Sequence, residues 1–401
     1  MLTHAIMAVL GAALATVLLL AFYNPTSGGA GISLPGSGAV PAPGSGSGTL
    51  TGGEQAIVTK VNPGLVIINT TLQYDSEAAA GTGMVINADG LVLTNNHVID
   101  HSTKITATVA STGTTYTAMV LGYDKAGDIA LIQLRNASGL ATVPIGNSSS
   151  VKAGSPVIAL GNAEGRGTIT AKPGRVTELN QTIIASEDGG STASETLHGM
   201  IQTNADIVPG DSGGPLASSV GVIGMDTAGS EGNNQQASTG FAIPINTALA
   251  VARQIAGGHA SSTVTIGYPP FVGIFTGSGS DSSPQAQAQQ EQQQNGGFSG
   301  GTGNTPQCYT SNSGLTVPST IAPASSGALI IGTICGSPAA SAGMTGGAVI
   351  TAVNGQAVGS PDDLAGILSR FHPGDTISVT WISPSGHRTT SSLHLTAGPP
   401  Q

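Results

Sequence analysis

The chain has 401 residues, among them 60 glycines and 23 prolines, and only 8% of its residues are charged. This length predicts two or three domains, and the glycine and proline content predicts many turns and linkers. The net charge of −10 argues against nucleic acid as a partner, because phosphate binding needs clustered Lys and Arg. The eight histidines are scattered and no cysteine has metal-ligand spacing, so we expect no metal and no cofactor.

An uncharged segment runs from Ala5 to Tyr23. As a helix it would be roughly 28 Å long, close to the thickness of a bilayer core. We therefore predict that residues 1–23 form a transmembrane anchor or a signal segment, followed by a Gly/Ser/Pro linker over 24–53. The segment lacks a clean cleavage site, which favours an uncleaved anchor. The expected location is extracytoplasmic, either anchored to the cell membrane or secreted.

Residues 54–258 are predicted to form a mostly β domain. From Ile57 to Phe241, short Val, Ile, Leu and Thr runs alternate with Gly, Asn and Asp turns, which is typical of a barrel or sandwich. A helix is then predicted from Asn246 to Ile255, with Asn246 as its N-cap and two glycines at its end.

Three motifs in this domain indicate nucleophilic catalysis. The string GDSGGP at 210–215 places a serine in a glycine-rich turn, and the strings TNNHV at 94–98 and DIALIQL at 128–134 place polar residues at the edges of apolar strands. The chain order is His, Asp, Ser, whereas an α/β-hydrolase needs Ser, acid, His and a helix after the serine. The order and the following strand favour a chymotrypsin-like fold.

We assign Ser212 as the nucleophile, His97 as the general base and Asp128 as the carboxylate that orients it. The N–H groups of Gly210 and Ser212 are expected to form the oxyanion hole. Asp128 is preferred to Asp124 because a strand begins directly after it and could hold its carboxylate rigidly.

The strings TNNHVI, DIALIQL and PGDSGGPL, with a C-terminal module of the PDZ kind, resemble the HtrA/Deg family of extracytoplasmic serine proteases, most of all its secreted PepA-type bacterial members. The resemblance covers most of residues 54–397. It implies a chymotrypsin-like double β-barrel followed by an α+β PDZ domain, with the triad between the barrels. It also implies ATP-independent action on unfolded or misfolded polypeptides and suggests homotrimers.

Asp206 stands six residues before Ser212, where the chymotrypsin fold places the floor of its primary pocket. A carboxylate there would select Arg or Lys, whereas the HtrA pattern usually has a small residue and prefers small apolar side chains. Asp206 is therefore either a pocket carboxylate or a hydrogen-bonding member of its own loop.

Residues 264–397 are predicted to form the PDZ domain, which binds C-terminal peptides as an added strand. The string FVGI at 271–274 resembles the carboxylate-binding loop, and Ser360 followed by Pro361 predicts a helix start. The residues assigned to peptide contact are Phe271, Val272, Gly273, Ile274, Leu364 and Leu368.

An insertion at about 277–306 contains a glutamine-rich tract, which we predict to be disordered and able to cover the peptide groove. Cys308 and Cys335 favour a disulfide in an exported protein, with two free buried thiols as the alternative.

Two functions follow from these features. The first is a serine endopeptidase, and the complete triad favours it. The alternative is a latent or inactive protease-fold scaffold or chaperone that binds polypeptides through its PDZ domain.

Overall fold

The computed structural model describes residues 50–400 apart from 73, 75–76, 187–193, 231–238, 278, 295–307 and 313–314. The predicted membrane or signal segment, residues 1–23, and the linker up to residue 49 lie outside the described residues. Among the helices that the structure does describe, none is long and apolar enough to cross a membrane.

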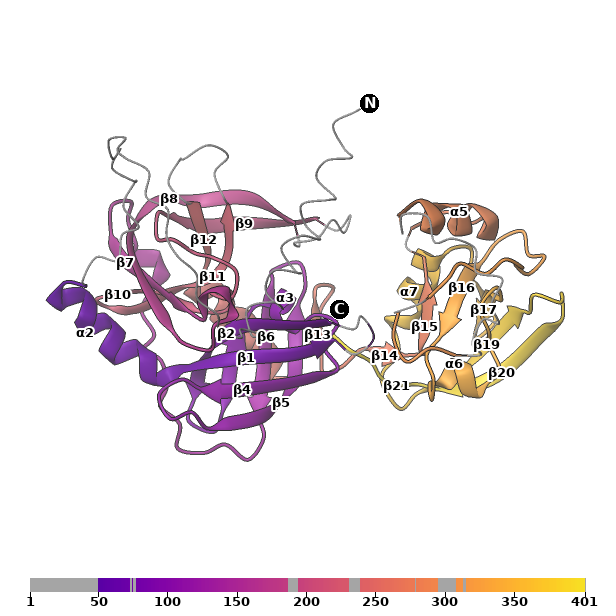
Figure 1. Ribbon diagram of the computed structural model, residues 1–401, viewed down its shortest axis with the longest axis horizontal. Helices are drawn as coiled ribbons and strands as arrows, with labels where there is room; N and C mark the ends of the chain where they lie inside the picture. The colour runs from indigo at the N-terminus through magenta and orange to yellow at the C-terminus, as the bar shows by residue number, and fades with distance from the viewer. Residues whose placement is uncertain are drawn as a thin grey trace, which may run out of the picture. The chain divides into compact units, whose positions relative to one another are not determined.

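Six antiparallel strands form a first barrel (Figure 1). They are β1 (Leu65–Leu72), β2 (Glu77–Asn87), β3 (Leu91–Thr94), β4 (Lys104–Val109), β5 (Thr115–Asp124) and β6 (Ile129–Leu134). The order is β5-β4-β1-β2-β3-β6, and the additional pairing of β5 with β6 closes the ring. A short strand, β13 (Val264–Ile266), pairs with the other edge of β5.

A second closed barrel has the order β10-β11-β12-β9-β8-β7. Its strands are β7 (Pro156–Gly161), β8 (Thr170–Ser186), β9 (Ser194–Thr203), β10 (Pro215–Ser218), β11 (Gly221–Ser230) and β12 (Thr239–Pro244). One apolar cluster holds the barrels together, because it contains Leu93 and Leu131 of the first barrel and Leu160 and Met225 of the second. The domain is therefore the predicted double β-barrel.

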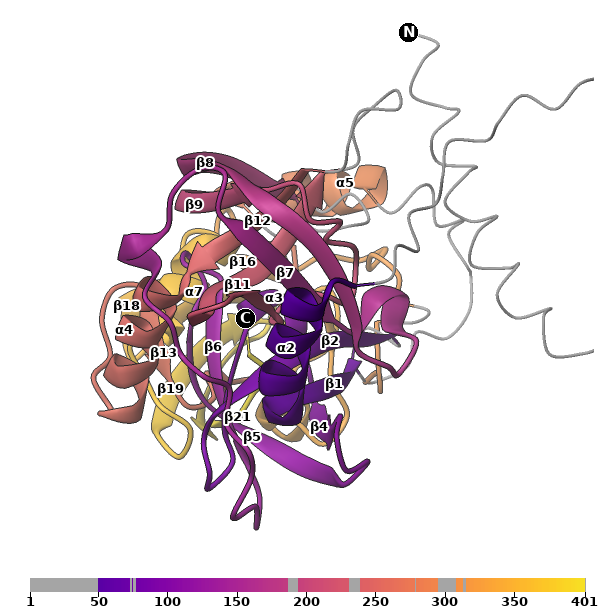
Figure 2. The ribbon, with the colours of Figure 1, turned by 90° about the vertical axis from the view of Figure 1, so that its left-hand side faces the viewer.

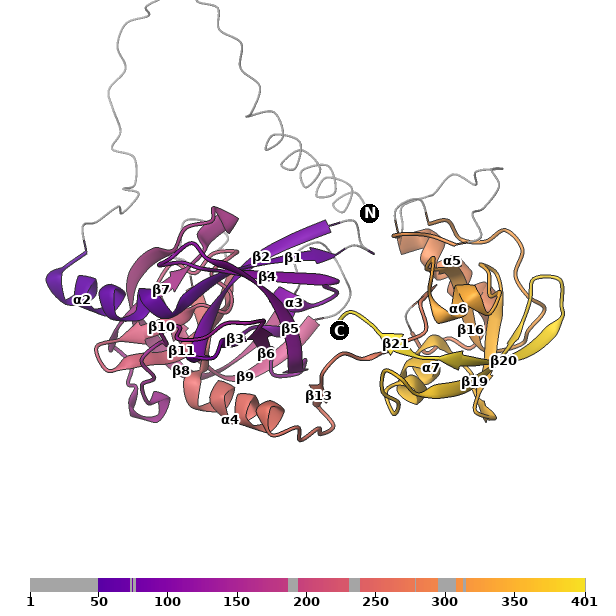
Figure 3. The same ribbon diagram turned by 90° about the horizontal axis from the view of Figure 1, so that it is seen from below.

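Helices flank the barrels and connect their strands. They are α2 (Gly52–Val61), α3 (Asn96–Ile99) and α4 (Ile245–Ala256), with the 3-10 turns η1 (Asn62–Gly64), η2 (Ser148–Ser150) and η3 (Ala163–Gly165). Helix α2, which faces the viewer in Figure 2, packs against β7, β10 and β11, whereas α4 contacts strands of both barrels (Figure 3). An amphipathic helix that covers both barrels adds apolar burial to the joint between them.

Two predictions about these helices were wrong. Ile57 lies in α2 rather than in a strand, because Thr51 and Glu54 form a capping box that starts a helix there. Helix α4 begins at Ile245 after Pro244, without a side-chain cap. Asn246 is not the N-cap, since its side-chain amide donates to Asn147 and Ser149.

The PDZ domain is built on a five-strand path with the order β15-β16-β17-β19-β20. The strands are β15 (Ile274–Thr276), β16 (Ala328–Thr333), β17 (Val349–Val353), β18 (Gln356–Ala357), β19 (Thr376–Ile382) and β20 (Arg388–His394), with a separate pair β14 (Pro270–Phe271) and β21 (Thr396–Ala397). The helices are α5 (Pro284–Gln294), α6 (Pro338–Ser341) and α7 (Pro361–Leu368). The inward side of β19 packs with α7 in one core that includes Trp381, Leu364 and Ile367.

The predicted disorder of the insertion was wrong for residues 284–294, which form α5. The tract has few large apolar side chains, but Ala288 is buried against Leu329, Ile331 and Val349. Gln287 is also buried and satisfies backbone groups of the sheet. Residues 295–306 lie outside the described part of the chain.

Candidate active site and peptide groove

His97 and Asp128 meet because β3 and β6 are paired: Asp128 directly precedes β6, and His97 lies in α3, which follows β3. Nδ1 of His97 is 3.0 Å from both carboxylate oxygens of Asp128, and the His97 backbone N–H donates to Asp128 Oδ1 at 3.1 Å. The Asp128 side chain is 3% exposed, whereas the His97 side chain is 33% exposed. A carboxylate at Nδ1 fixes the tautomer that leaves Nε2 as a proton acceptor facing substrate.

Ser212 is connected to this pair through Thr227 on β11. The Ser212 hydroxyl donates to the Thr227 carbonyl at 3.2 Å, and the Thr227 hydroxyl donates to Oδ2 of Asp128. The second barrel therefore supports both the nucleophile and the carboxylate. Proton transfer from Ser212 to His97 requires the hydroxyl proton to turn away from Thr227.

The peptide units around Ser212 are oriented by hydrogen bonds to their carbonyls. The Pro209 carbonyl accepts from the Glu164 N–H at 2.7 Å, and the Asp211 carbonyl accepts from the Gly214 N–H at 2.8 Å. In a trans peptide the C=O and the following N–H point in opposite directions. These contacts therefore turn the N–H groups of Gly210 and Ser212 toward the other side, where an oxyanion hole requires them.

Gly210 is required by this backbone conformation. Its φ is +94°, and a Cβ atom added to it would lie 2.3 Å from the Asn162 carbonyl oxygen. A residue with a side chain would clash there and would adopt the left-handed region at a cost. In the described part of the chain, the N–H groups of Gly210 and Ser212 donate to no other group, so both remain available to a ligand.

Thr82 on β2 ties the first barrel to the nucleophile loop, and sequence reasoning missed it. Its N–H donates to the Ser212 carbonyl and its hydroxyl donates to the Gly210 carbonyl, both at 2.8 Å. The same hydroxyl accepts from the Asn162 N–H at 2.9 Å. The signal in the sequence is Gly81 beside Thr82, because a Cβ atom added to Gly81 would lie 2.7 Å from the Val98 side chain and 3.3 Å from the Ser212 carbonyl oxygen.

The two other carboxylates considered from the sequence are engaged elsewhere. Asp124 lies at the end of β5 and accepts from the Gly127 N–H at 3.2 Å, while Asp128 is the carboxylate at His97. Asp206 accepts from Lys172 Nζ at 3.2 Å and its side chain is 49% exposed. A cation from β8 thus already lies beside the residue proposed for the pocket floor.

Two further acids are buried behind the nucleophile and were not recognised from the sequence. Asp211 accepts from the Val208 N–H through Oδ2, whereas Oδ1 of Asp211 and both carboxylate oxygens of Asp226 have no hydrogen-bond partner among the described residues. Burial raises the pKa of Asp211 to about 6. Burial, and then the charge of Asp211, raise the pKa of Asp226 well above its ordinary range.

The FVGI loop of the PDZ domain presents its N–H groups in the same way as the nucleophile loop. The Val272 carbonyl accepts from the Ala339 N–H at 3.0 Å, and the Gly273 carbonyl accepts from the Ile334 N–H at 2.9 Å and from the Ser337 hydroxyl at 3.0 Å. The N–H groups of Gly273 and Ile274 therefore point away from α6. Two convergent N–H groups of this kind suit a carboxylate.

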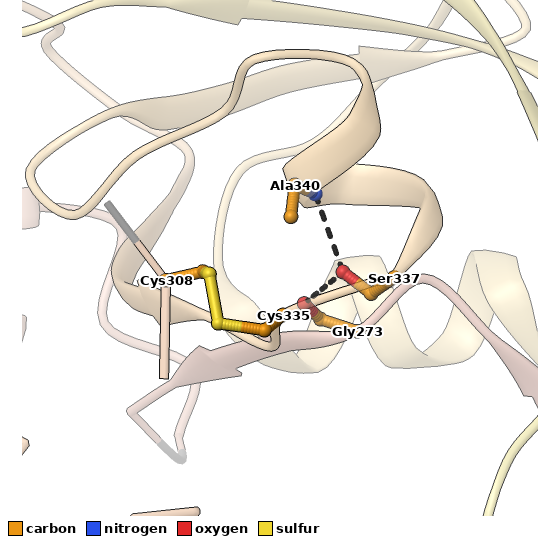
Figure 4. The surroundings of a disulfide bond; sticks show 5 residues. All are labelled: Gly273, Cys308, Cys335, Ser337 and Ala340. Carbon is orange, nitrogen blue, oxygen red and sulfur yellow. Dashed lines mark hydrogen bonds between the residues drawn. A yellow bond between two sulfur atoms is a disulfide. The ribbon is translucent and has the colours of Figure 1, made fainter. Parts of the chain in front are cut away.

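Gly273 has a φ of +80°, and a Cβ atom added to it would lie 2.1 Å from Cβ of Ser337. Ser337 has a second role, because its hydroxyl also accepts from the Ala340 N–H and caps α6 (Figure 4). The structure joins Cys308 and Cys335 by a disulfide beside this loop, with Cα atoms 4.9 Å apart. The disulfide fixes residue 308, at the end of the insertion, to the segment that orients Gly273.

The other predicted peptide contacts lie in one groove. Its walls are β15, through Ile274, and α7, through Leu364 and Leu368, and the loop residues Phe271, Val272 and Gly273 lie at one end. All six residues assigned from the sequence thus line the same depression. Sequence reasoning missed Thr276 and Ala365, which also line it.

Comparison with known families agrees with this architecture. A trypsin-like peptidase domain model matches residues 81–225, and a PDZ domain model matches residues 331–382. The first match contains Thr82, His97, Asp128 and Ser212. The fold and the two matches therefore define a trypsin-like peptidase domain joined to a PDZ domain.

The chain is also similar to proteins that are named as serine proteases. The chain is 29% identical over 363 residues to the serine protease PepD of Mycobacterium tuberculosis, covering 86% of this chain and 66% of PepD. It is 38% identical over 177 residues to the periplasmic pH-dependent serine endoprotease DegQ of Escherichia coli, covering 44% of this chain and 37% of DegQ. The chain thus spans less than two thirds of either relative. Both relatives are named as serine proteases, and a trypsin-like peptidase domain followed by a PDZ domain supports the resemblance to the HtrA/Deg family of serine proteases.

The raised pKa of Asp211 predicts how stability depends on pH. Asp211 binds its proton more tightly in the folded protein than in the unfolded chain. Protonation of Asp211 therefore stabilises the fold fully below about pH 4, and this stabilisation is lost as the pH rises to about 6. A difference of roughly 2 pKa units between the folded and unfolded states corresponds to about 3 kcal/mol of unfolding free energy. In Asp211→Asn, the decrease in unfolding free energy between pH 4 and pH 8, measured with urea, should be smaller than in the wild type by about this amount.

Asp206→Asn is the matched control, because Asp206 is a nearby but half-exposed acid and its replacement should change this pH dependence little. If the Asp211→Asn protein loses as much stability between the two pH values as the wild type, then Asp211 does not titrate in the range inferred from its burial.

Proposed function

We propose that this protein is a serine endopeptidase that cleaves unfolded or misfolded polypeptides outside the cytoplasm. The observation that carries the proposal is the arrangement at Ser212. Its own N–H and that of Gly210 face one side of the nucleophile loop, and Thr227 links its hydroxyl to the His97–Asp128 pair. These are the parts that acyl transfer by a serine needs.

The reaction follows from these positions. Oγ of Ser212 attacks the carbonyl carbon of the scissile peptide bond while Nε2 of His97 takes its proton, and Asp128 stabilises the resulting imidazolium. The oxyanion of the tetrahedral intermediate accepts hydrogen bonds from Gly210 and Ser212. His97 then gives its proton to the leaving amine, and a water molecule releases the acyl group from Ser212 by the same steps.

The PDZ domain is proposed to capture substrate or regulatory chains by their C-termini. The support is the groove between β15 and α7, whose apolar walls suit a side chain and whose FVGI loop suits a carboxylate. An extracytoplasmic location is supported by the disulfide and by the periplasmic location in the name of DegQ. Anchoring by residues 1–23 is part of the same proposal and rests on the sequence.

We propose a preference for small apolar residues at the cleavage site over Arg or Lys. Asp206 already has Lys172 as a cationic partner, and its half-exposed carboxylate is screened by water. A substrate cation would have to compete with Lys172 for it. Identification of the residues before each cut by mass spectrometry tests this preference.

Activity itself is tested with a denatured protein as substrate and mass spectrometry of the new termini. We expect cuts with the wild type and none with Ser212→Ala. Asp128→Asn should lower kcat by about four orders of magnitude, because His97 would lose the carboxylate that fixes its tautomer. Asp124→Asn is the matched control and should keep most of the activity. No cleavage by the wild type, or equal losses in both Asp variants, would contradict the assigned triad.

A second prediction concerns Thr82. Thr82→Val keeps the side-chain shape but removes the hydrogen bonds to the Gly210 carbonyl and the Asn162 N–H. Each is worth about 1 kcal/mol, so kcat/KM should fall roughly tenfold or more through a less well positioned oxyanion hole.

The matched control for this variant is Thr70→Val. Thr70 is also a buried threonine, on the neighbouring strand β1, and its hydroxyl donates to the Ala79 carbonyl within the sheet. Equal activities of the two valine variants would show that Thr82 does not act through the nucleophile loop.

A further inference from the structure

The peptide groove offers only a short strand edge to a ligand. Strand β15 lies at the edge of the PDZ sheet and has only three residues, Ile274 to Thr276. An extended peptide that pairs with it advances about 3.3 Å per residue, so β15 can pair with roughly three peptide residues. The carboxylate end of such a peptide lies at the FVGI loop, and its other end lies beside Thr276 and the start of α7.

Beyond Thr276 the chain does not continue along the sheet but crosses to α7. We call residues 279–281 the crossover segment. The Gly279 N–H donates to Oδ1 of Asp362 at 3.2 Å, and the Asp362 N–H donates to the Gly279 carbonyl at 3.3 Å. The Asp362 N–H is one of the first amides of α7 and has no acceptor within the helix, so Gly279 satisfies a group that would otherwise need water.

A buried glutamine holds the crossover segment in place. Gln287 is 2% exposed, and its Nε2 donates to the carbonyls of Asp281 at 2.8 Å and Gly327 at 2.7 Å. Its Oε1 accepts from the Leu329 N–H at 2.8 Å. The last pair between β15 and β16 joins Thr276 and Ile330. Beyond this pair, Gln287 makes hydrogen bonds to the backbone of β16 that a longer β15 would otherwise make.

We propose that the crossover segment, anchored on Asp362, is an end wall that limits the groove to the last three residues of a C-terminal peptide. The proposal rests on the proposed binding of C-termini by this domain. A fourth residue, counted from the carboxylate, would lie beyond Thr276, on the side where Gly279 is hydrogen-bonded to Asp362. The occupant is therefore a free C-terminus whose last residues are apolar enough for the walls formed by Ile274, Leu364 and Leu368.

The test uses the full chain carrying Ser212→Ala, so that peptides are not cut, and N-acetylated peptides of three, four, six and eight residues that share their last three residues. Calorimetry should give affinities that agree within about twofold at all lengths, because residues before the third find no strand to pair with. An increase of about tenfold or more from three to six residues would overturn the end wall. Absence of binding at every length would instead overturn the proposed capture of C-termini, and the wall with it.

Asp362→Ala provides the second arm, since it removes the side-chain acceptor of the Gly279 N–H and leaves only the backbone hydrogen bond from the Asp362 N–H to the Gly279 carbonyl. The six-residue peptide should then bind about fivefold more tightly than the three-residue peptide, as the released Gly279 N–H donates one hydrogen bond to a carbonyl of the longer peptide. Asp363→Ala is the matched control on the same helical turn, because Asp363 bonds to Gly359 and not to the crossover segment. Identical length profiles for the two alanine variants would overturn the role of Asp362 in the wall.

Discussion

The proposed catalysis depends on the orientation of one peptide unit, the one that joins Pro209 to Gly210. Its carbonyl is held by the Glu164 N–H, and its N–H is turned toward the oxyanion hole as a consequence of peptide planarity. The next carbonyl, that of Gly210, is held by the Thr82 hydroxyl. Because Thr82 belongs to the first barrel and Glu164 to the second, the hole depends on the packing of the two barrels against one another.

The FVGI loop of the PDZ domain orients its N–H groups in the same way, and the anion proposed to bind there is a peptide carboxylate. Carbonyls of Val272 and Gly273 are held from behind by residues around α6, and the N–H groups that follow them face the groove. Each site thus offers backbone donors, rather than Lys or Arg, to negative charge, which fits a chain with only 8% charged residues. The donors are oriented before a ligand arrives, so little reorganisation opposes binding.

Sequence patterns predicted those features of the fold that depend on residues close together in the chain. The order of the motifs indicated the double barrel, and the strand that begins at residue 129 distinguished Asp128 from Asp124 as the residue placed at His97. Thr82 and Thr227 could not be predicted in this way, since each acts on residues far away in the sequence. The glutamine-rich helix was missed because composition does not reveal that a polar side chain such as Gln287 is buried and fully bonded.

The most direct test of the preorganised site is the labelling of Ser212 by a fluorophosphonate. The serine needs both the general base and the oxyanion hole to attack the phosphorus of this reagent. The folded protein without any peptide ligand is treated, and intact mass and peptide mapping locate the adduct. The orientation of the Pro209–Gly210 peptide predicts one adduct, on Ser212, that is lost on denaturation and in His97→Ala. A folded protein that stays unlabelled until a peptide binds its PDZ domain would contradict the account and indicate a latent enzyme.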